Sequence, residues 1–183
     1  MKVTRQQMLE ILPSGGVRTM EFLHYINEWA DTFEINTPLR MAHFLGQILQ
    51  ETGGLKYTKE IGKDYYFNKY ENGKLAKTLG NTQKGDGSKY RGRGLIMITG
   101  RANYNAYQKS GYCNGDIMEQ PELLERPCGA TKSGMWWWWK HGCNTIADKD
   151  DVDKLTKKIN GGTNGLESRK AWTNKCKKAL GVR

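Results

Sequence analysis

Glu51 has the residue type and the setting that proton transfer to a leaving group requires. It stands at the end of a predicted amphipathic helix, directly after the apolar stretch FLGQILQ. Helical spacing places its side chain on the same face as Phe44 and Ile48. Partial burial on such a face favours the protonated form of a carboxyl group, which a general acid needs. Glu51 is therefore a candidate general acid.

A second carboxylate, Glu60, follows nine residues later. On a continuous helix the two side chains would point to opposite sides, because each residue turns the chain by about 100°. Gly53 and Gly54 break the helix and allow residues 55–60 to fold back. Most glycosidases need two carboxyl groups, which flank the glycosidic bond that is cleaved. The alternative is a pair of solvated glutamates without a catalytic role.

The segment from Tyr90 to Tyr104 is rich in glycine and arginine and carries a third candidate, Thr99. Its hydroxyl group could cap a helix that begins at Gly100, which is the more common role. It could instead position a water molecule near Glu60. The segment does not match a dinucleotide-binding fingerprint, because Met97 occupies the position of the third glycine.

Three motifs occur in order along the chain: MAHFLGQILQETGGLKYTKE, GDGSKYRGRGLIMITGRANY and INGGTNGLESR. Together they resemble glycoside hydrolase family 19, the chitinase-like family, and more closely its bacteriophage endolysin branch. The resemblance covers about residues 37–180. It implies a mainly α-helical, lysozyme-like bilobed fold with a small irregular or β-hairpin segment and a central cleft.

The resemblance also implies roles for individual residues. Glu51 matches the family's general acid and Glu60 its second carboxylate, while Thr99 matches the residue that holds the attacking water. Substrate binding is expected from five residues, namely Gln50, Tyr90, Asn103, Asn160 and Arg169. We also expect Arg169 to form an ion pair near Glu60. Two positions depart from the family pattern, because Gln50 replaces a histidine and Met97 replaces a glutamine.

Hydrophobic periodicity and capping residues predict the elements that position these side chains. Thr4 and Gln7 form a predicted capping box, and Thr37 with Pro38 opens the helix that ends at Glu51. Residues 72–100 contain seven glycines and are expected to form loops with one short hairpin. Further helical patterns cover 17–33, 100–110, 122–140, 150–160 and 166–180. The four tryptophans at 136–139 are expected to lie in a helix largely buried in the core. We expect one catalytic domain over 1–183, without a separate cell-wall-binding domain.

The composition limits the classes of function. Lys and Arg outnumber Asp and Glu by 29 to 19, which gives a net charge of +10. Such a balance favours a polyanionic partner: nucleic acid, an anionic membrane surface or an acidic cell-wall polymer. The three histidines have no metal-ligand spacing, and the four cysteines form no C-x-x-C pair. We expect free thiols, with a Cys113–Cys143 disulfide as the alternative, and neither a metal nor an organic cofactor.

These observations predict an endolysin that hydrolyses β-1,4 bonds of peptidoglycan with inversion, acting as a monomer at the anionic cell envelope. Inversion requires the two carboxyl groups to lie about 6.5–9.5 Å apart. The sequence shows no signal peptide, so accumulation in the host cytoplasm before release is expected. Three alternatives stay open: a chitinase, a lytic transglycosylase with one catalytic glutamate, and a basic nucleic-acid-binding module.

Overall fold

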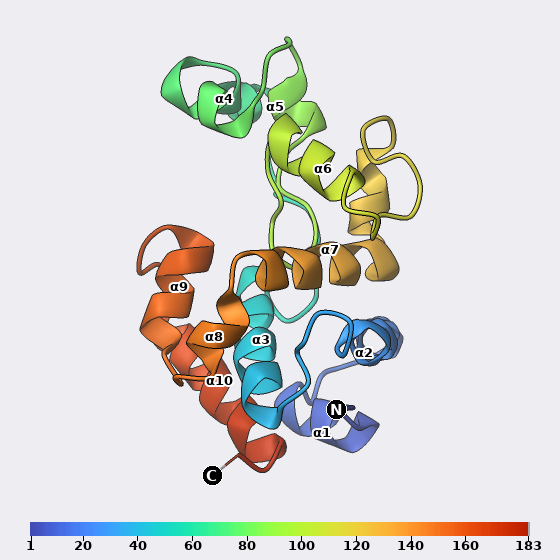
Figure 1. Ribbon diagram of the computed structural model, residues 1–183, viewed down its shortest axis with the longest axis vertical. Helices are drawn as coiled ribbons and strands as arrows, with labels where there is room; N and C mark the ends of the chain where they lie inside the picture. The colour runs from blue at the N-terminus through green and yellow to red at the C-terminus, as the bar shows by residue number, and fades with distance from the viewer. Residues whose placement is uncertain (183) are drawn as a thin grey trace. The chain divides into compact units, whose positions relative to one another are not determined.

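The computed structural model describes residues 1–182, which fold into two compact units. Unit 1 combines Met1–Tyr57 with the segment from Met135 to the end of the chain, and unit 2 comprises Thr58–Gly134. Both units are built mainly from helices, which confirms the predicted class (Figure 1). Within residues 1–182, β structure consists of two isolated bridges, Lys59 with Arg93 and Arg93 with Ile98, and the second closes a tight antiparallel turn in the segment where a short hairpin was expected.

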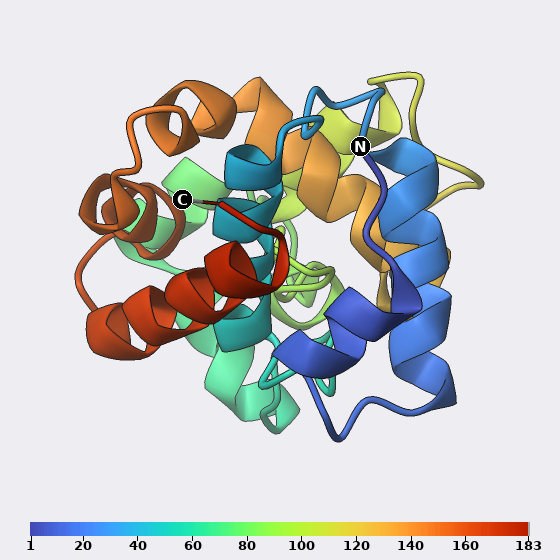
Figure 2. The same ribbon diagram turned by 90° about the horizontal axis from the view of Figure 1, so that it is seen from below.

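Unit 1 is organised around two long helices, α3 and α10, that pack against each other (Figure 2). The two backbones come close at Gly46, where a Cβ atom would lie 2.2 Å from the Thr173 hydroxyl oxygen. The helices that contribute to this unit are α1 (Arg5–Ile11), α2 (Val17–Trp29), α3 (Pro38–Glu51), the end of α7 (Pro127–Lys140), α8 (Cys143–Ala147), α9 (Val152–Asn160) and α10 (Leu166–Ala179).

Local sequence signals account for the start and the end of α3. The Thr37 side chain accepts a hydrogen bond from the amide of Arg40, and Pro38 occupies the first helical turn. The helix ends at Glu51, where Gly53 and Gly54 adopt positive φ angles. These features confirm the predicted helix, as does the capping box of Thr4 and Gln7 in α1.

The tryptophan run lies in α7 and is mostly buried, as expected. Trp138 is fully buried and Trp136 is 4% exposed, whereas Trp139 lies at the surface. The buried indole of Trp138 donates a 2.7 Å hydrogen bond to the side chain of Asn144. The run therefore belongs largely to the core.

Unit 2 contains short helices joined by ordered turns. They are η1 (Asp64–Tyr70), α4 (Gly73–Leu79), α5 (Asp86–Lys89), α6 (Arg101–Gln108), η2 (Pro121–Glu125) and the beginning of α7. The prediction of loops over residues 72–100 was therefore wrong for α4 and α5. Side-chain contacts order this region: the Asp86 carboxylate accepts the amides of Thr82 and Gln83 and pairs with Arg101. Such contacts outweigh the low helix propensity of glycine.

Buried aromatic and charged groups form the core of unit 2. Tyr90 and Tyr104 stack edge to face with ring centroids 5.1 Å apart. Beside them, Arg93 is 7% exposed and pairs with Glu125 at 2.7 Å. A buried charge needs such partners, because desolvation without them costs several kcal/mol. In residues 1–182, no helix is long and apolar enough to cross a membrane.

Candidate active site

Glu60 is held in unit 2 by three donors. The Tyr70 hydroxyl donates to its Oε1 atom at 2.9 Å, and the Gly92 amide donates to Oε2 at 3.3 Å. The Lys69 ammonium lies 3.6 Å from Oε1. The Glu60 amide in turn donates to the Gly92 carbonyl at 2.8 Å. These contacts fix the orientation of the carboxylate, as a general base requires.

The two residues that hold Oε1 are neighbours in η1. Burial and the hydrogen bond to Glu60 together raise the pKa of Tyr70 to about 12, so its hydroxyl group stays a donor at neutral pH. The Lys69 ammonium lies 3.6 Å from the Tyr66 ring centroid and 4.7 Å from that of Tyr70. Burial opposes the charge of Lys69, but contacts with Tyr66, Tyr70 and Glu60 raise its pKa overall.

Thr99 lies beside Glu60 across Gly92. A Cβ atom on Gly92 would lie 3.1 Å from the Thr99 hydroxyl oxygen and 3.3 Å from Glu60 Oε2. The missing side chain therefore leaves space between the two polar groups. Thr99 does not cap α6, because Gly100 occupies the cap position without a side-chain bond, and its hydroxyl group donates to the Met97 carbonyl at 3.0 Å. Of the two predicted roles, the capping role is wrong.

Asn103 joins this group from the first turns of α6. Its amide donates to the Thr99 carbonyl at 2.8 Å, which orders the backbone next to the hydroxyl group. The structure thus brings Glu60, Thr99 and Asn103 together in unit 2.

Glu51 lies in unit 1 at the last position of α3, and its partner is Arg169 of α10. The guanidinium group of Arg169 also donates to the Gln47 side chain at 2.7 Å and to the Asn164 carbonyl at 3.2 Å. Arg169 is only 2% exposed. The predicted ion pair of Arg169 with Glu60 was wrong. Arg169 pairs with Glu51 instead, because α10 packs against α3.

Two further predicted residues lie on unit 1. The Gln50 side chain accepts a 2.5 Å hydrogen bond from the Ser168 hydroxyl group and keeps its amide nitrogen for other partners. Asn160 is exposed at the end of α9, where Gly161 adopts a left-handed conformation. Both side chains are accessible to a ligand.

Tyr90 was expected to bind substrate, and the structure corrects this. Its side chain is 1% exposed, and its hydroxyl group donates to the Met118 carbonyl at 3.2 Å. Edge-to-face packing against Tyr104 makes it part of the interior of unit 2. A fully packed ring has no surface left for a sugar.

Tyr70 and Lys69 were not among the predicted site residues. The sequence holds a weak signal for them, the aromatic run DYYFNKY shortly after Glu60. Which of its four aromatic rings faces Glu60 depends on how η1 folds back onto residue 60.

The structure does not favour catalysis by a cysteine thiol or by a metal ion. Burial raises the pKa of Cys113 to about 11 and of Cys143 and Cys176 to about 12, so these thiols stay protonated and are poor nucleophiles at neutral pH. In the described part of the chain, no group of His, Cys, Asp and Glu is placed to hold a metal ion.

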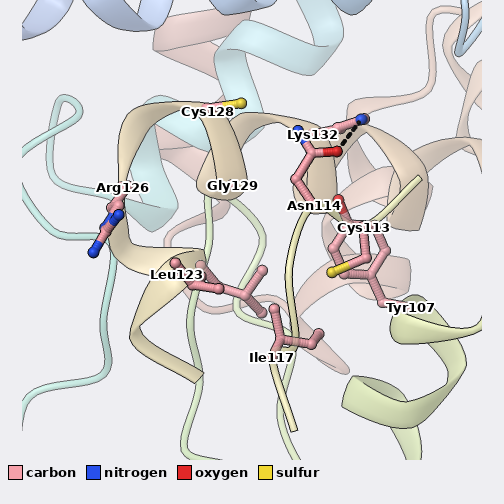
Figure 3. Close-up of a pocket in the computed structure, with 10 residues that line it drawn as sticks. Tyr107, Cys113, Asn114, Ile117, Leu123, Arg126, Cys128, Gly129 and Lys132 are labelled. Atoms are coloured by element: carbon pink, nitrogen blue, oxygen red, sulfur yellow. Dashed lines mark hydrogen bonds between the residues drawn. The ribbon is translucent and has the colours of Figure 1, made fainter. Parts of the chain in front are cut away.

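A partly open hollow of about 170 Å³ in unit 2 contains none of the candidate residues (Figure 3). Its wall is mostly apolar, with Ile117 and Leu123 beside the thiols of Cys113 and Cys128. Lys132 donates to the Asn114 side chain at 3.2 Å at its edge. The carboxylates of the predicted chemistry lie elsewhere.

The comparisons with known proteins agree with the predicted family. No family model matches the chain. A protein of Haemophilus influenzae, described as a glycosyl hydrolase family 19 domain-containing protein, is 35% identical over 156 residues, which covers 72% of this chain and 75% of the relative.

The fold resembles solved chitinase structures. Chitinase C from Streptomyces griseus HUT6037 matches with a TM-score of 0.76 at 21% identity, over 98% of this chain and 93% of that one. A bacterial family 19 chitinase matches with a TM-score of 0.72 at 22% identity, over 99% of this chain and 96% of that one. These matches show the mainly helical, lysozyme-like fold. The Haemophilus relative and the shared fold together establish that the chain is a glycoside hydrolase and belongs to family 19.

Proposed function

We propose that this glycoside hydrolase is a phage-type endolysin that cleaves β-1,4 bonds in the glycan strands of bacterial peptidoglycan. The proposed hydrolysis rests on the position of the Glu60 carboxylate. Tyr70, Lys69 and the Gly92 amide hold it, and the Thr99 hydroxyl group lies next to it. This arrangement fits a base that removes a proton from water. The endolysin part rests on the three sequence motifs and on the charge of the chain.

In the proposed mechanism, Glu51 donates a proton to the glycosidic oxygen as the bond to the anomeric carbon breaks. Glu60 takes a proton from a water molecule placed by Thr99, and the water oxygen bonds to the anomeric carbon from the opposite face. Single displacement inverts the configuration at that carbon.

Arg169 imposes a condition on this mechanism. The contact with the buried Arg169 guanidinium must hold the Glu51 carboxyl group in a position from which it can reach the glycosidic oxygen.

The net charge of +10 supports an anionic polymer as the substrate. Long-range attraction concentrates a basic protein on an anionic wall, and salt screens it beyond a distance of about 8–10 Å at ordinary ionic strength. We therefore expect activity on cell walls to fall as salt rises. The endolysin assignment further implies a monomer that accumulates in the host cytoplasm before its release to the wall and then lyses the host cell.

The chitinase alternative is supported by the fold, since the solved structures that the chain resembles are chitinases. Incubation of the protein with purified peptidoglycan and, separately, with chitin tests both functions. Mass spectrometry of the new sugar ends identifies the reaction. Hydrolysis of peptidoglycan to reducing ends supports the proposal, whereas products from chitin alone support the chitinase.

Two other outcomes would overturn the endolysin proposal. Anhydro-muramic ends identify a lytic transglycosylase, in which Glu60→Gln has little effect. Tight DNA binding with a steep salt dependence, together with no cleavage of either polymer, identifies the nucleic-acid-binding module.

A further inference from the structure

A hollow of about 350 Å³ lies on unit 1 next to the candidate acid. It is lined by Gln50, the residue before Glu51, and by Leu49, Gly53 and Gly54. The other lining residues come from the turn after α1, from the loop after α3 and from α10; they are Leu12, Ser14, Lys56 and Trp172. A ligand bound here would contact the last turn of α3, whose final residue is Glu51.

Internal hydrogen bonds hold the loop that borders the hollow. Gly53, Gly54 and Leu55 have φ angles of +57°, +77° and +64°. The Thr52 hydroxyl group fixes this turn, because it donates to the Ile48 carbonyl at 2.6 Å and accepts the Leu55 amide at 2.8 Å. A preformed site loses less entropy on binding than a mobile one.

Gln50 is oriented for hydrogen bonding to a ligand. Ser168 donates to its side-chain oxygen at 2.5 Å, which identifies the amide nitrogen as the group left for a ligand carbonyl or carboxylate. Gly165 makes room for this amide, since a Cβ atom there would lie 2.9 Å from Nε2.

Trp172 separates this hollow from a second one of about 310 Å³, which is lined by Ser168, Ala171, Trp172 and Lys175. The two hollows share the Trp172 side chain of α10 and are treated together as one track. Such a track suits an extended ligand of several residues better than a single small molecule.

The charge of the track is positive. Lys56 lines the first hollow and Lys175 the second, and neither hollow is lined by Asp or Glu. The Lys175 ammonium lies 5.5 Å from the Trp172 ring centroid. The track therefore combines an aromatic wall, amide and hydroxyl donors and two cations, which fits a chain of short apolar groups and carboxylates.

We infer that this track binds the stem peptide of peptidoglycan while the glycan lies at Glu51. Stem peptides carry alanine methyl groups and several free carboxylates, whereas chitin has neither. The inference rests on the proposed function and adds a determinant of specificity, because the residues of the track would distinguish peptide-bearing strands from uncharged GlcNAc polymers.

Charge reversal of the two lysines tests the inference. The double variant Lys56→Glu/Lys175→Glu is compared with Lys154→Glu/Lys178→Glu, which changes the net charge equally at exposed positions outside both hollows. Lys178, like Lys175, lies near the end of α10. Each variant is assayed on intact peptidoglycan and on glycan strands from which an amidase has removed the peptides.

We expect the first variant to lose about tenfold in kcat/KM on intact peptidoglycan, equivalent to ~1.4 kcal/mol of binding, and less than about twofold on peptide-free strands. The control should change activity on both substrates by the same small factor. Equal losses of the first variant on both substrates, or equal losses of both variants on intact peptidoglycan, would overturn the inference.

A binding experiment separates this inference from the proposed function. A synthetic stem tetrapeptide is titrated into the wild-type protein, and the indole N–H resonance of Trp172 is followed by NMR after assignment with Trp172→Phe. A saturable shift that the Lys56→Glu/Lys175→Glu variant abolishes supports the track even if the glycan is not cleaved. Cleavage of peptidoglycan without such a shift overturns the track and leaves the proposed function intact.

Discussion

The hydroxyl group of Tyr70 donates a 2.9 Å hydrogen bond to the carboxylate of Glu60. The two residues are ten positions apart, and η1 brings the tyrosine back to the glutamate. Because burial raises the pKa of Tyr70 to about 12, the hydroxyl group remains a donor over the pH range in which a hydrolase works. Tyr70 is therefore a positioning residue for the candidate base.

Tyr70→Phe removes this donor and keeps the ring. We expect kcat to fall by about tenfold, as for the loss of one hydrogen bond to a charged group worth ~1.5 kcal/mol. KM should stay within about twofold of the wild-type value, because the lost donor positions the base and does not hold the sugar. Tyr65→Phe, on the same helix and 72% exposed, is the matched control. A rise in KM that accounts for the loss of activity would assign Tyr70 a merely structural role.

The general-acid role of Glu51 predicts a dependence on the leaving group. Glu51→Gln should reduce hydrolysis of natural glycan by about 10²–10⁴-fold, the usual contribution of proton transfer. On an aryl glycoside whose phenolate leaves without protonation, the variant should lose far less. Equal losses on both substrates would argue against proton donation by Glu51. The melting temperature of the variant measures separately how much stability is lost when the buried Arg169 no longer has a carboxylate partner.

The role of Glu60 as a base in single displacement predicts the stereochemistry of the product. NMR of fresh digests should show the α-anomer as the first product of β-1,4 cleavage. Glu60→Ala should be several orders of magnitude slower, and azide should restore turnover with formation of an α-glycosyl azide. Initial release of the β-anomer would instead indicate a double displacement, in which a carboxylate attacks the sugar.

The ion pair of Asp86 and Arg101 predicts a pH-dependent contribution to stability. Asp86 is 2% exposed. Burial alone would raise its pKa, but the Arg101 guanidinium and the amides of Gln83 and Thr82 outweigh it and lower the pKa below the ordinary 3.8. The folded state is therefore stabilised at pH values above about 3.8, and this contribution is lost as the pH falls through the lower folded-state pKa.

Asp86→Asn should accordingly lower the free energy of unfolding at neutral pH by about 2–3 kcal/mol. This loss is smaller than the loss for a fully buried ion pair, because Arg101 is partly exposed. Urea unfolding at several pH values measures this difference, which should shrink below pH ~4 as the wild-type carboxylate takes up protons. Asp64→Asn removes a more exposed partner of Arg91 and should have a much smaller effect. A pH-independent difference between wild type and Asp86→Asn would contradict the assignment.

Local sequence determined the helix that carries Glu51. Thr37, Pro38 and the glycines at 53 and 54 act on neighbouring residues through capping and backbone conformation, so their effect can be predicted from spacing. The same holds for the capping box of α1 and for the burial of the tryptophan run, since both follow from short-range patterns. The motif order along the chain also pointed to glycoside hydrolase family 19.

Only the tertiary structure decided which side chains surround the two carboxylates. Arg169 lies 118 residues from Glu51, and the packing of α10 on α3 makes it that residue's partner. The same kind of packing buried Tyr90 inside unit 2 and placed Tyr70 on Glu60. Hydrogen bonds and ion pairs act over a few ångströms, so residues far apart in sequence acquire these roles only once the chain has folded.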